Sequence, residues 1–223
     1  KNGYERRLGD WKNAAQECIV TGHDAGVRDG LAKVCFDLEM SVGAACRLEY
    51  AVNGKGDLQV RMDYRPLKDG LQLIPKVGMR MRIPAEYSQV SWYGRGPHEN
   101  YPDRKSGNFI GQYSMPLDEF IFDYASPQDN ANRCDTRWFS LGNSSRDIEI
   151  HGLQELNFRA WPYGEEDLEG SAHPFDIPAR DFINVNIDFK IHGVGGNDGW
   201  GARTMDAYTI DPAQPYSFGF IIR

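Results

Sequence analysis

The sequence lacks any apolar run long enough to cross a bilayer, and its first residues, KNGYERRLGD, contain no hydrophobic signal segment. Basic residues are not clustered, and the 223 residues carry a formal net charge of −7. Because nucleic-acid binding needs a concentrated positive surface, this pattern argues against a phosphate-backbone partner. We therefore expect neither a membrane nor a nucleic acid to be bound.

Cysteine is scarce, with four residues and no CxxC pair, which argues against a structural zinc site. Free cysteines are among the most buried residue types, so we expect free and mostly buried thiols. The alternative is a pairing of Cys35 with Cys46 across neighbouring strands. Four of the five histidines are considered as ligands and have no metal-ligand spacing either, so we expect no metal or cofactor on this chain; these four are His98, His151, His173 and His192.

Short apolar stretches dominate the remainder and are separated by 24 glycines and 12 prolines. Their alternation with polar residues at a period of two is typical of strands, and the NGKG at 53–56 is typical of a hairpin turn. The fold class expected is all-β, a large antiparallel β-sandwich of roughly ten to fourteen strands. The predicted strands cover 34–40, 48–52, 58–62, 71–83, 89–93, 147–152, 156–160, 182–191, 207–210 and 217–222.

One or two short helices are expected beside the strands. The first candidate covers 4–16, although Gly9 weakens it. The second covers 165–171, where acidic residues in the first turn favour the helix dipole and Pro174 follows the end. The intervening stretch 91–143 is rich in loops, aromatic residues and charges, a composition typical of functional or interface loops.

Three segments carry a resemblance to a known family: VSWYGRGPHENYPDR at 90–104, SPQDNANRCDTRW at 126–138 and HGVGGNDGWG at 192–201. In this order and at these separations they resemble the C-terminal domain of the β-galactosidases of glycoside hydrolase family 2. The resemblance covers essentially the whole chain and implies a sandwich like that of galactose mutarotase. Residues 1–223 are then a single domain that lacks its first strands, because family members begin this domain roughly sixty residues earlier.

The resemblance also implies what chemistry is absent. Retaining glycosidases use two carboxyl groups about 5 Å apart, and in this family both are glutamates on a barrel that precedes this domain. No segment here resembles that barrel, so we assign no catalytic residue and expect the isolated chain to be inactive. The implied parent hydrolyses terminal β-D-galactosides with retention, in the bacterial cytoplasm or periplasm, and the expected partners are β-galactoside sugars, other domains of the parent and further copies of the parent. The Mg²⁺ or Na⁺ used by family members has no site that we place on this chain.

Trp200 is the strongest candidate for substrate binding. A lone tryptophan is more often a core residue, but the family's matching tryptophan forms part of the sugar-binding wall, and an indole face suits the apolar face of a pyranose. The resemblance implies that Asn197 and Asp198 shape this loop or bind sugar hydroxyls. Gly199 and Gly201 replace serines common in the family, so a more mobile loop is expected.

Other polar and aromatic residues have structural interpretations. Charged residues of the 90–104 segment are expected to pair and hold loops together, with a sugar or ion site as the alternative; they are Arg95, Glu99, Asp103 and Arg104. Glu165 and Glu166 are expected at the solvated surface. The aromatic residues expected in the core or against neighbouring domains are Trp92, Tyr93, Trp138 and Trp161.

Two other functions remain open from the sequence. A stand-alone carbohydrate-binding module would use the same sandwich to hold a sugar. An epimerase of the mutarotase type would need a separated acid and base, which the adjacent His98 and Glu99 do not supply.

Overall fold

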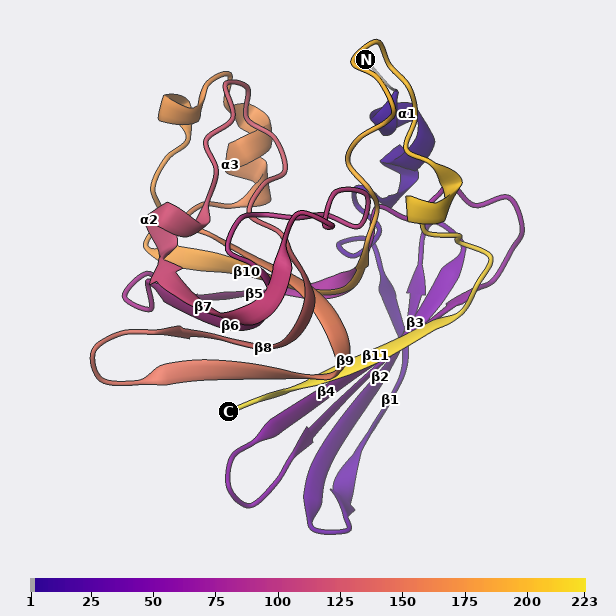
Figure 1. The fold of residues 1–223 in the computed structure, drawn as a ribbon. Helices are drawn as coiled ribbons and strands as arrows, with labels where there is room; N and C mark the ends of the chain where they lie inside the picture. Colours follow the sequence, from indigo (N-terminus) through magenta and orange to yellow (C-terminus); the bar gives the residue numbers. More distant parts are fainter. Residues whose placement is uncertain (1–2) are drawn as a thin grey trace. The chain divides into compact units, whose positions relative to one another are not determined.

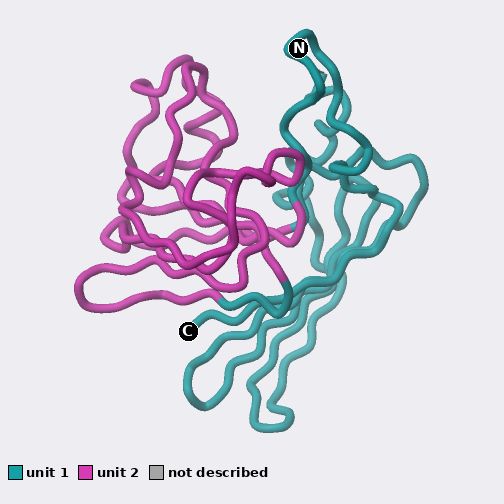
Figure 2. The backbone as a smooth tube through the Cα atoms, viewed as in Figure 1, with its two compact units in different colours: residues 1–77, 151–154, 191–223 teal, residues 78–150, 155–190 magenta. Residues whose placement is uncertain are grey.

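The computed structural model describes residues 3–223, which form the two compact units coloured in Figure 2. Unit 1 consists of residues up to 77 together with 151–154 and 191–223, and unit 2 consists of 78–150 and 155–190. The strand pairings within each unit are antiparallel, which confirms the predicted all-β class. No helix in this described part of the chain is long and apolar enough to span a membrane.

Unit 1 is built on a sheet in which five strands lie in the order β1-β2-β3-β4-β11 (Figure 1). Their bounds are Ile19–Arg28 for β1, Leu31–Met40 for β2, Ala44–Val52 for β3, Leu58–Pro66 for β4 and Tyr216–Ile222 for β11. The predicted hairpin joins β3 to β4: the side chain of Asn53 accepts hydrogen bonds from the amides of Lys55 and Asp57, and Gly56 has a φ of 93°. Only glycine takes such a φ at little cost.

Unit 2 contains the strands β6 (Gln89–Gly96), β7 (Phe109–Pro116) and β8 (Arg133–Gly142), with most of β5 (Lys76–Pro84), β9 (Asp147–Trp161) and β10 (Phe182–Ile191). β6 lies between β7 and β8, and β10 lies between β5 and β9. Its core is an aromatic cluster in which the rings of Phe139 and Phe158 stack 4.1 Å apart and Trp92 and Phe120 pack beside them. All four side chains are buried, which confirms the core prediction for Trp92; Trp161 is buried as well.

The helices are short. They are α1 (Tyr4–Leu8), α2 (Leu117–Phe120) and α3 (Glu165–Gly170), with single 3₁₀ turns η1 (Gly9–Trp11), η2 (Pro174–Asp176) and η3 (Asp206–Tyr208). The prediction over 165–171 is confirmed. The prediction over 4–16 was too long, because the α-helix ends at Leu8 and the chain continues from Gly9 as a 3₁₀ turn.

Other differences from the sequence prediction concern strand boundaries. The strand predicted at 207–210 is wrong, since η3 and its following turn occupy this place. The two strands predicted at 147–152 and 156–160 are one continuous strand, β9. Three strands were missed, β1, β7 and β8. The four thiols are free, and three of them, those of Cys35, Cys46 and Cys134, are buried, as expected.

Candidate functional site

The loop that carries Trp200 follows β10 and is fixed at its base. The amide of His192 donates to the carbonyl of Pro75 at 2.9 Å, and the amide of Gly193 donates to the carbonyl of Tyr208 at 2.8 Å. The buried hydroxyl of Thr204 donates to the carbonyl of Gly193 at 3.0 Å, which closes the loop. Residues 194–203 therefore form a loop whose two ends are held by hydrogen bonds within unit 1.

The two arms of this loop approach closely at Gly196. A Cβ at this position would lie 2.2 Å from the carbonyl oxygen of Ala202, so no larger residue fits without moving the backbone. Gly201 has a φ of 120°, a conformation that side chains rarely adopt. Gly196 and Gly201 thus have defined conformational roles in this loop.

The carboxylate of Asp198 organises the tip of the loop. Its Oδ1 accepts hydrogen bonds from the amides of Trp200 at 2.8 Å and Ala202 at 3.2 Å. These backbone hydrogen bonds hold the pKa of Asp198 below its ordinary value. The carboxylate therefore stays ionised at neutral pH and fixes the backbone on both sides of Gly201.

The side chain of Trp200 is 94 % exposed at the tip of this loop, and Asn197 is exposed as well. The structure thus brings the three candidate residues together on one loop. Exposure of a large aromatic surface is unfavourable in water, because the burial of such a ring is a major source of binding energy. An indole held in this way has an apolar face free for a partner.

The polar segment of unit 2 contains a network of paired charges. Glu99 accepts hydrogen bonds from Arg104 Nη2 at 2.7 Å, from the amide of Ala131 at 2.7 Å and from the hydroxyl of Tyr124. Asp135 is bonded to Arg95 and to Lys105 Nζ. The prediction that Arg95, Glu99 and Arg104 hold loops together is therefore confirmed.

A second cluster surrounds the buried guanidinium of Arg159, which stacks over the ring of Trp161 at 4.1 Å. Glu165 accepts from Arg159 at 2.8 Å and from Arg80 at 3.3 Å, and Asp129 is bonded to Arg159 as well. Glu165 is thus a half-buried anchor of α3, which corrects the expectation of a solvated residue. Glu166 does lie at the surface, paired with Arg82.

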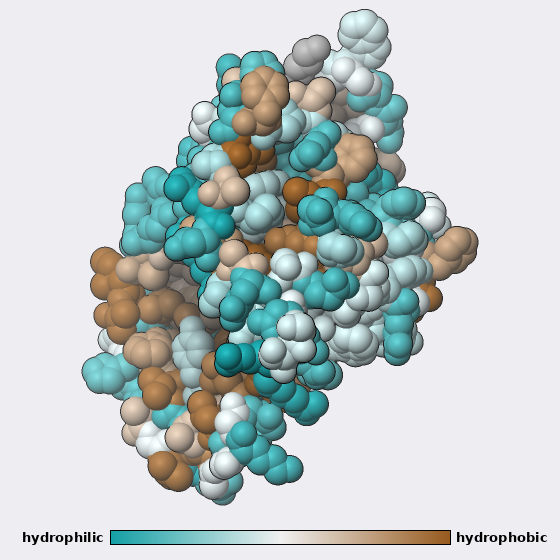
Figure 3. All heavy atoms as spheres, turned by 90° about the vertical axis from the view of Figure 1, so that its left-hand side faces the viewer, coloured by the Kyte–Doolittle hydropathy of each residue, from teal (hydrophilic) through white to brown (hydrophobic). Residues whose placement is uncertain are grey.

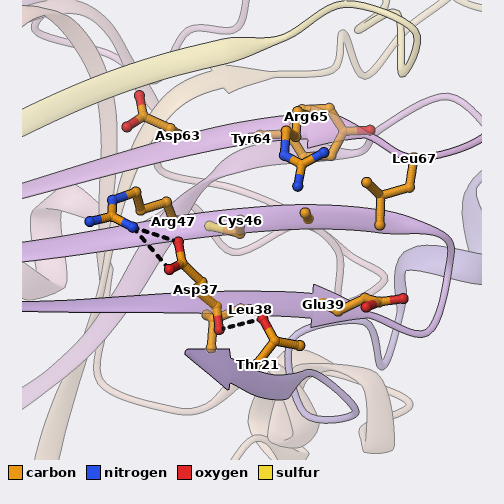
Figure 4. A pocket seen from close by; sticks show the side chains of 11 residues that line it. Thr21, Asp37, Leu38, Glu39, Cys46, Arg47, Asp63, Tyr64, Arg65 and Leu67 are labelled. Carbon is orange, nitrogen blue, oxygen red and sulfur yellow. Dashed lines mark hydrogen bonds and ion pairs between the residues drawn. The ribbon is translucent and has the colours of Figure 1, made fainter. Parts of the chain in front are cut away.

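Sequence reasoning did not identify a hollow on the polar side of the sheet of unit 1 (Figure 4). It has a volume of about 300 Å³, and Arg47 there bonds both carboxylate oxygens of Asp37 at 2.7 and 2.9 Å. Charged residues alternate with apolar residues along β2, β3 and β4, and this alternation was the sequence signal that could have indicated a charged surface here. Since the central charges of the hollow pair with each other and are half exposed, this surface indicates a solvated face more than a ligand site.

Comparison with known proteins identifies the family to which this chain belongs. Residues 2–222 match the family described as beta galactosidase small chain. This chain belongs to that family.

Among curated relatives, a β-galactosidase of Priestia megaterium is 30 % identical over 100 % of this chain and 22 % of its own length. A β-galactosidase of Pseudoalteromonas haloplanktis is 34 % identical over 94 % of this chain and 20 % of its own length. The chain therefore spans about a fifth of the length of these relatives. Among solved structures, a GalM/aldose epimerase homologue from C. elegans is similar over 90 % of this chain and 67 % of its own, with a TM-score of 0.48 and 10 % identity.

Proposed function

We propose that this chain is the C-terminal domain of a β-galactosidase that hydrolyses terminal β-D-galactosides with retention of configuration. In this proposal both units belong to one domain. The domain supplies scaffold, a surface for other domains of the parent and one aromatic wall of the sugar site. The observation that carries the proposal is the exposed indole of Trp200 on an anchored loop, in a chain that belongs to a β-galactosidase family.

Trp200 binds the galactoside through its ring, while Asn197 and Asp198 lie beside it as polar neighbours. A pyranose has one face of C–H groups that packs on an indole, which leaves the hydroxyls free to bond elsewhere. The hydrogen bonds of Asp198 support a role in fixing the backbone that carries the ring before the sugar arrives. A loop backbone ordered in advance loses less conformational entropy on binding.

The isolated chain is inactive in this proposal, because the catalytic glutamates belong to a barrel outside it. Incubation of the purified chain with a chromogenic β-galactoside should give no turnover above that of a buffer control. Turnover that co-purifies with the chain through several columns would contradict the proposal.

The positive test uses a chimera in which the aligned segment of the Priestia megaterium enzyme is replaced by this chain. The chimera should hydrolyse the chromogenic galactoside, and Trp200→Ala should lower kcat/KM by at least tenfold, whereas Trp200→Phe should retain part of it. Phe175→Ala is the matched control, because Phe175 is also strongly exposed (83 %) but lies in unit 2 on another segment. Equal effects of Trp200→Ala and Phe175→Ala would refute the assignment of Trp200.

The same exposed indole also favours a second candidate, a stand-alone carbohydrate-binding module. Titration of the isolated chain with galactose or lactose distinguishes the two functions. Saturable quenching of tryptophan fluorescence that Trp200→Ala abolishes would support the module. An unchanged signal at tens of millimolar sugar supports the domain of a larger enzyme.

A further inference from the structure

One side of the sheet in unit 1 is largely apolar from β1 to β4. Residues paired across neighbouring antiparallel strands point to the same side, and the pairs on this side join Val34 to Tyr50, Phe36 to Leu48 and Leu38 to Cys46. The same side continues through β4, where Tyr50 pairs with Val60 and Leu48 with Met62. We call this surface the apolar face; its apolar residues on β1 to β3 are Val20, Ala25, Val27, Ala32, Val34, Phe36, Leu38, Met40, Ala44, Cys46, Leu48, Tyr50 and Val52. One polar residue, His23, lies on the same side, where it pairs with Phe36.

The other side of the same strands is polar. On β2 it presents Lys33, Asp37 and Glu39, and the pairs Asp37–Arg47 and Arg47–Asp63 continue it across β3 and β4. A sheet with one polar and one apolar side is the pattern of a layer whose apolar side packs against another layer.

The apolar face is uncovered towards the edge of the sheet. Val60 on β4 is only 2 % exposed, whereas Val34 and Val52 are 38 % and 39 % exposed and Val27 on β1 is 77 % exposed. Hydrophobic atoms gather over the lower part of the molecule in Figure 3, the level at which Figure 1 places the lower ends of β1 to β4. A contiguous exposed patch of this kind marks an interaction surface.

We propose that the apolar face binds a β-sheet layer supplied by the part of the parent β-galactosidase that lies outside this chain, an inference that rests on the proposed function. The Priestia megaterium relative aligns with all of this chain but devotes only 22 % of its length to the aligned segment. A layer on the same polypeptide is present at a high effective concentration, whereas a second copy must bind from solution.

The chemistry of the face specifies the partner as a sheet. Branched and aromatic side chains at every second position of neighbouring strands form a nearly flat apolar surface, against which a second sheet packs at about 10 Å. β1 stands at the end of the strand order within the described residues, so the partner's strands can also extend the sheet at this edge.

The test compares substitutions on the two sides of the sheet in the isolated chain and in the chimera with the Priestia megaterium enzyme. Val34→Lys places a charge on the apolar face, and Ile19→Lys is the matched control, because Ile19 is 68 % exposed and pairs with Glu39 on the polar side. Both variants should leave the melting temperature of the isolated chain within a few degrees of the wild type. In the chimera, Val34→Lys should reduce the yield of folded, active enzyme at least tenfold and Ile19→Lys should not.

Cysteine labelling provides a measurement that does not depend on activity. Val34→Cys should react with a maleimide in the isolated chain and be protected at least tenfold in the chimera, whereas Glu39→Cys, on the opposite side of β2, should react in both. If the chimera is insoluble, the truncated Priestia megaterium enzyme is added to the isolated chain in trans and the same two cysteines are labelled. Equal labelling of Val34→Cys with and without the remaining polypeptide would overturn the proposal.

The outcomes separate this inference from the proposed function. If the Val34→Cys chimera is folded and its cysteine is protected, but the wild-type chimera hydrolyses no galactoside, the docking surface is retained and the function is refuted. An active chimera that tolerates Val34→Lys retains the function and refutes the docking surface. An isolated chain that dimerises in light scattering, and is made monomeric by Val34→Lys, would assign the face to a second copy and overturn the proposal. Failure of Val34→Cys to react with the maleimide in a monomeric isolated chain would also overturn it, because the face would then be covered within the chain itself.

Discussion

Glu99 should contribute more to stability than an ordinary surface glutamate, because three donors from separate segments converge on it. Its side chain is 8 % exposed and accepts hydrogen bonds from Arg104, Tyr124 and the amide of Ala131. Ala131 is fully buried and has a φ of 67°, which is uncommon for a residue with a side chain. Glu99 therefore stabilises a backbone conformation that the sequence does not favour locally.

The size of the effect follows from which partners can reach water. In Glu99→Ala, the buried amide of Ala131 loses its acceptor, a loss that costs about 1–3 kcal/mol. Arg104 is 41 % exposed and can be rehydrated, so its pairing contributes at most about 1 kcal/mol. The free energy of unfolding should thus fall by about 1–4 kcal/mol, and Glu99→Gln, which retains an acceptor oxygen, should cost about half as much.

Urea unfolding followed by tryptophan fluorescence measures this loss of free energy. The indole of Trp161 donates a hydrogen bond to Asn130, the residue before Ala131, so its fluorescence reports the unfolding of this segment. Glu155→Ala is the control, because Glu155 also pairs with an arginine, Arg137, but at an exposed position. Its removal should change the free energy of unfolding by less than about 1 kcal/mol. A loss for Glu99→Ala no larger than that for Glu155→Ala would refute the reasoning.

Three further outcomes are expected. Burial favours the neutral form of Asp135, but the hydrogen bonds from Lys105 and Arg95 outweigh this and hold the pKa of Asp135 below the ordinary 3.8. Asp135→Asn should therefore lower the free energy of unfolding, measured with urea, above about pH 4, and this difference from the wild type should vanish as the pH falls through the lowered pKa of the folded chain. Titration with a thiol reagent should show one accessible cysteine, Cys18, in the folded chain and four in denaturant; rapid reaction of a second thiol would contradict the buried placement. Gly78→Ala should lower the free energy of unfolding by about 1–3 kcal/mol, because its Cβ would lie 2.8 Å from the Cα of Asp188, while Gly170→Ala, which faces open space, should not.

Sequence reasoning located the strands whose residues alternate regularly, and it missed those whose residues do not. β2 and β4 alternate because one side of each is apolar, and both were predicted close to their observed bounds. β1 has exposed residues on both sides, two glycines and a register shift between Val20 and Gly22, so its pattern contains no period. β8 is buried along both sides, which removes alternation in the opposite way. In both cases the strand forms through its pairing with neighbouring strands, and the local sequence pattern holds no information on that pairing.

The loop of Trp200 shows the same division between local and distant information. The sequence grouped Asp198 with Asn197 as neighbours of the tryptophan, but it could not assign the carboxylate to the amides of Trp200 and Ala202, since that depends on the backbone conformation of Gly201. The glycines beside Trp200 were expected to make the loop more mobile. The hydrogen bonds of Asp198 oppose that mobility, because they fix the backbone on both sides of the most permissive residue. In a sugar site, such fixing would lower the entropy that the loop loses on binding, so the permissive glycines and the hydrogen bonds of this aspartate act in opposite directions on the same loop.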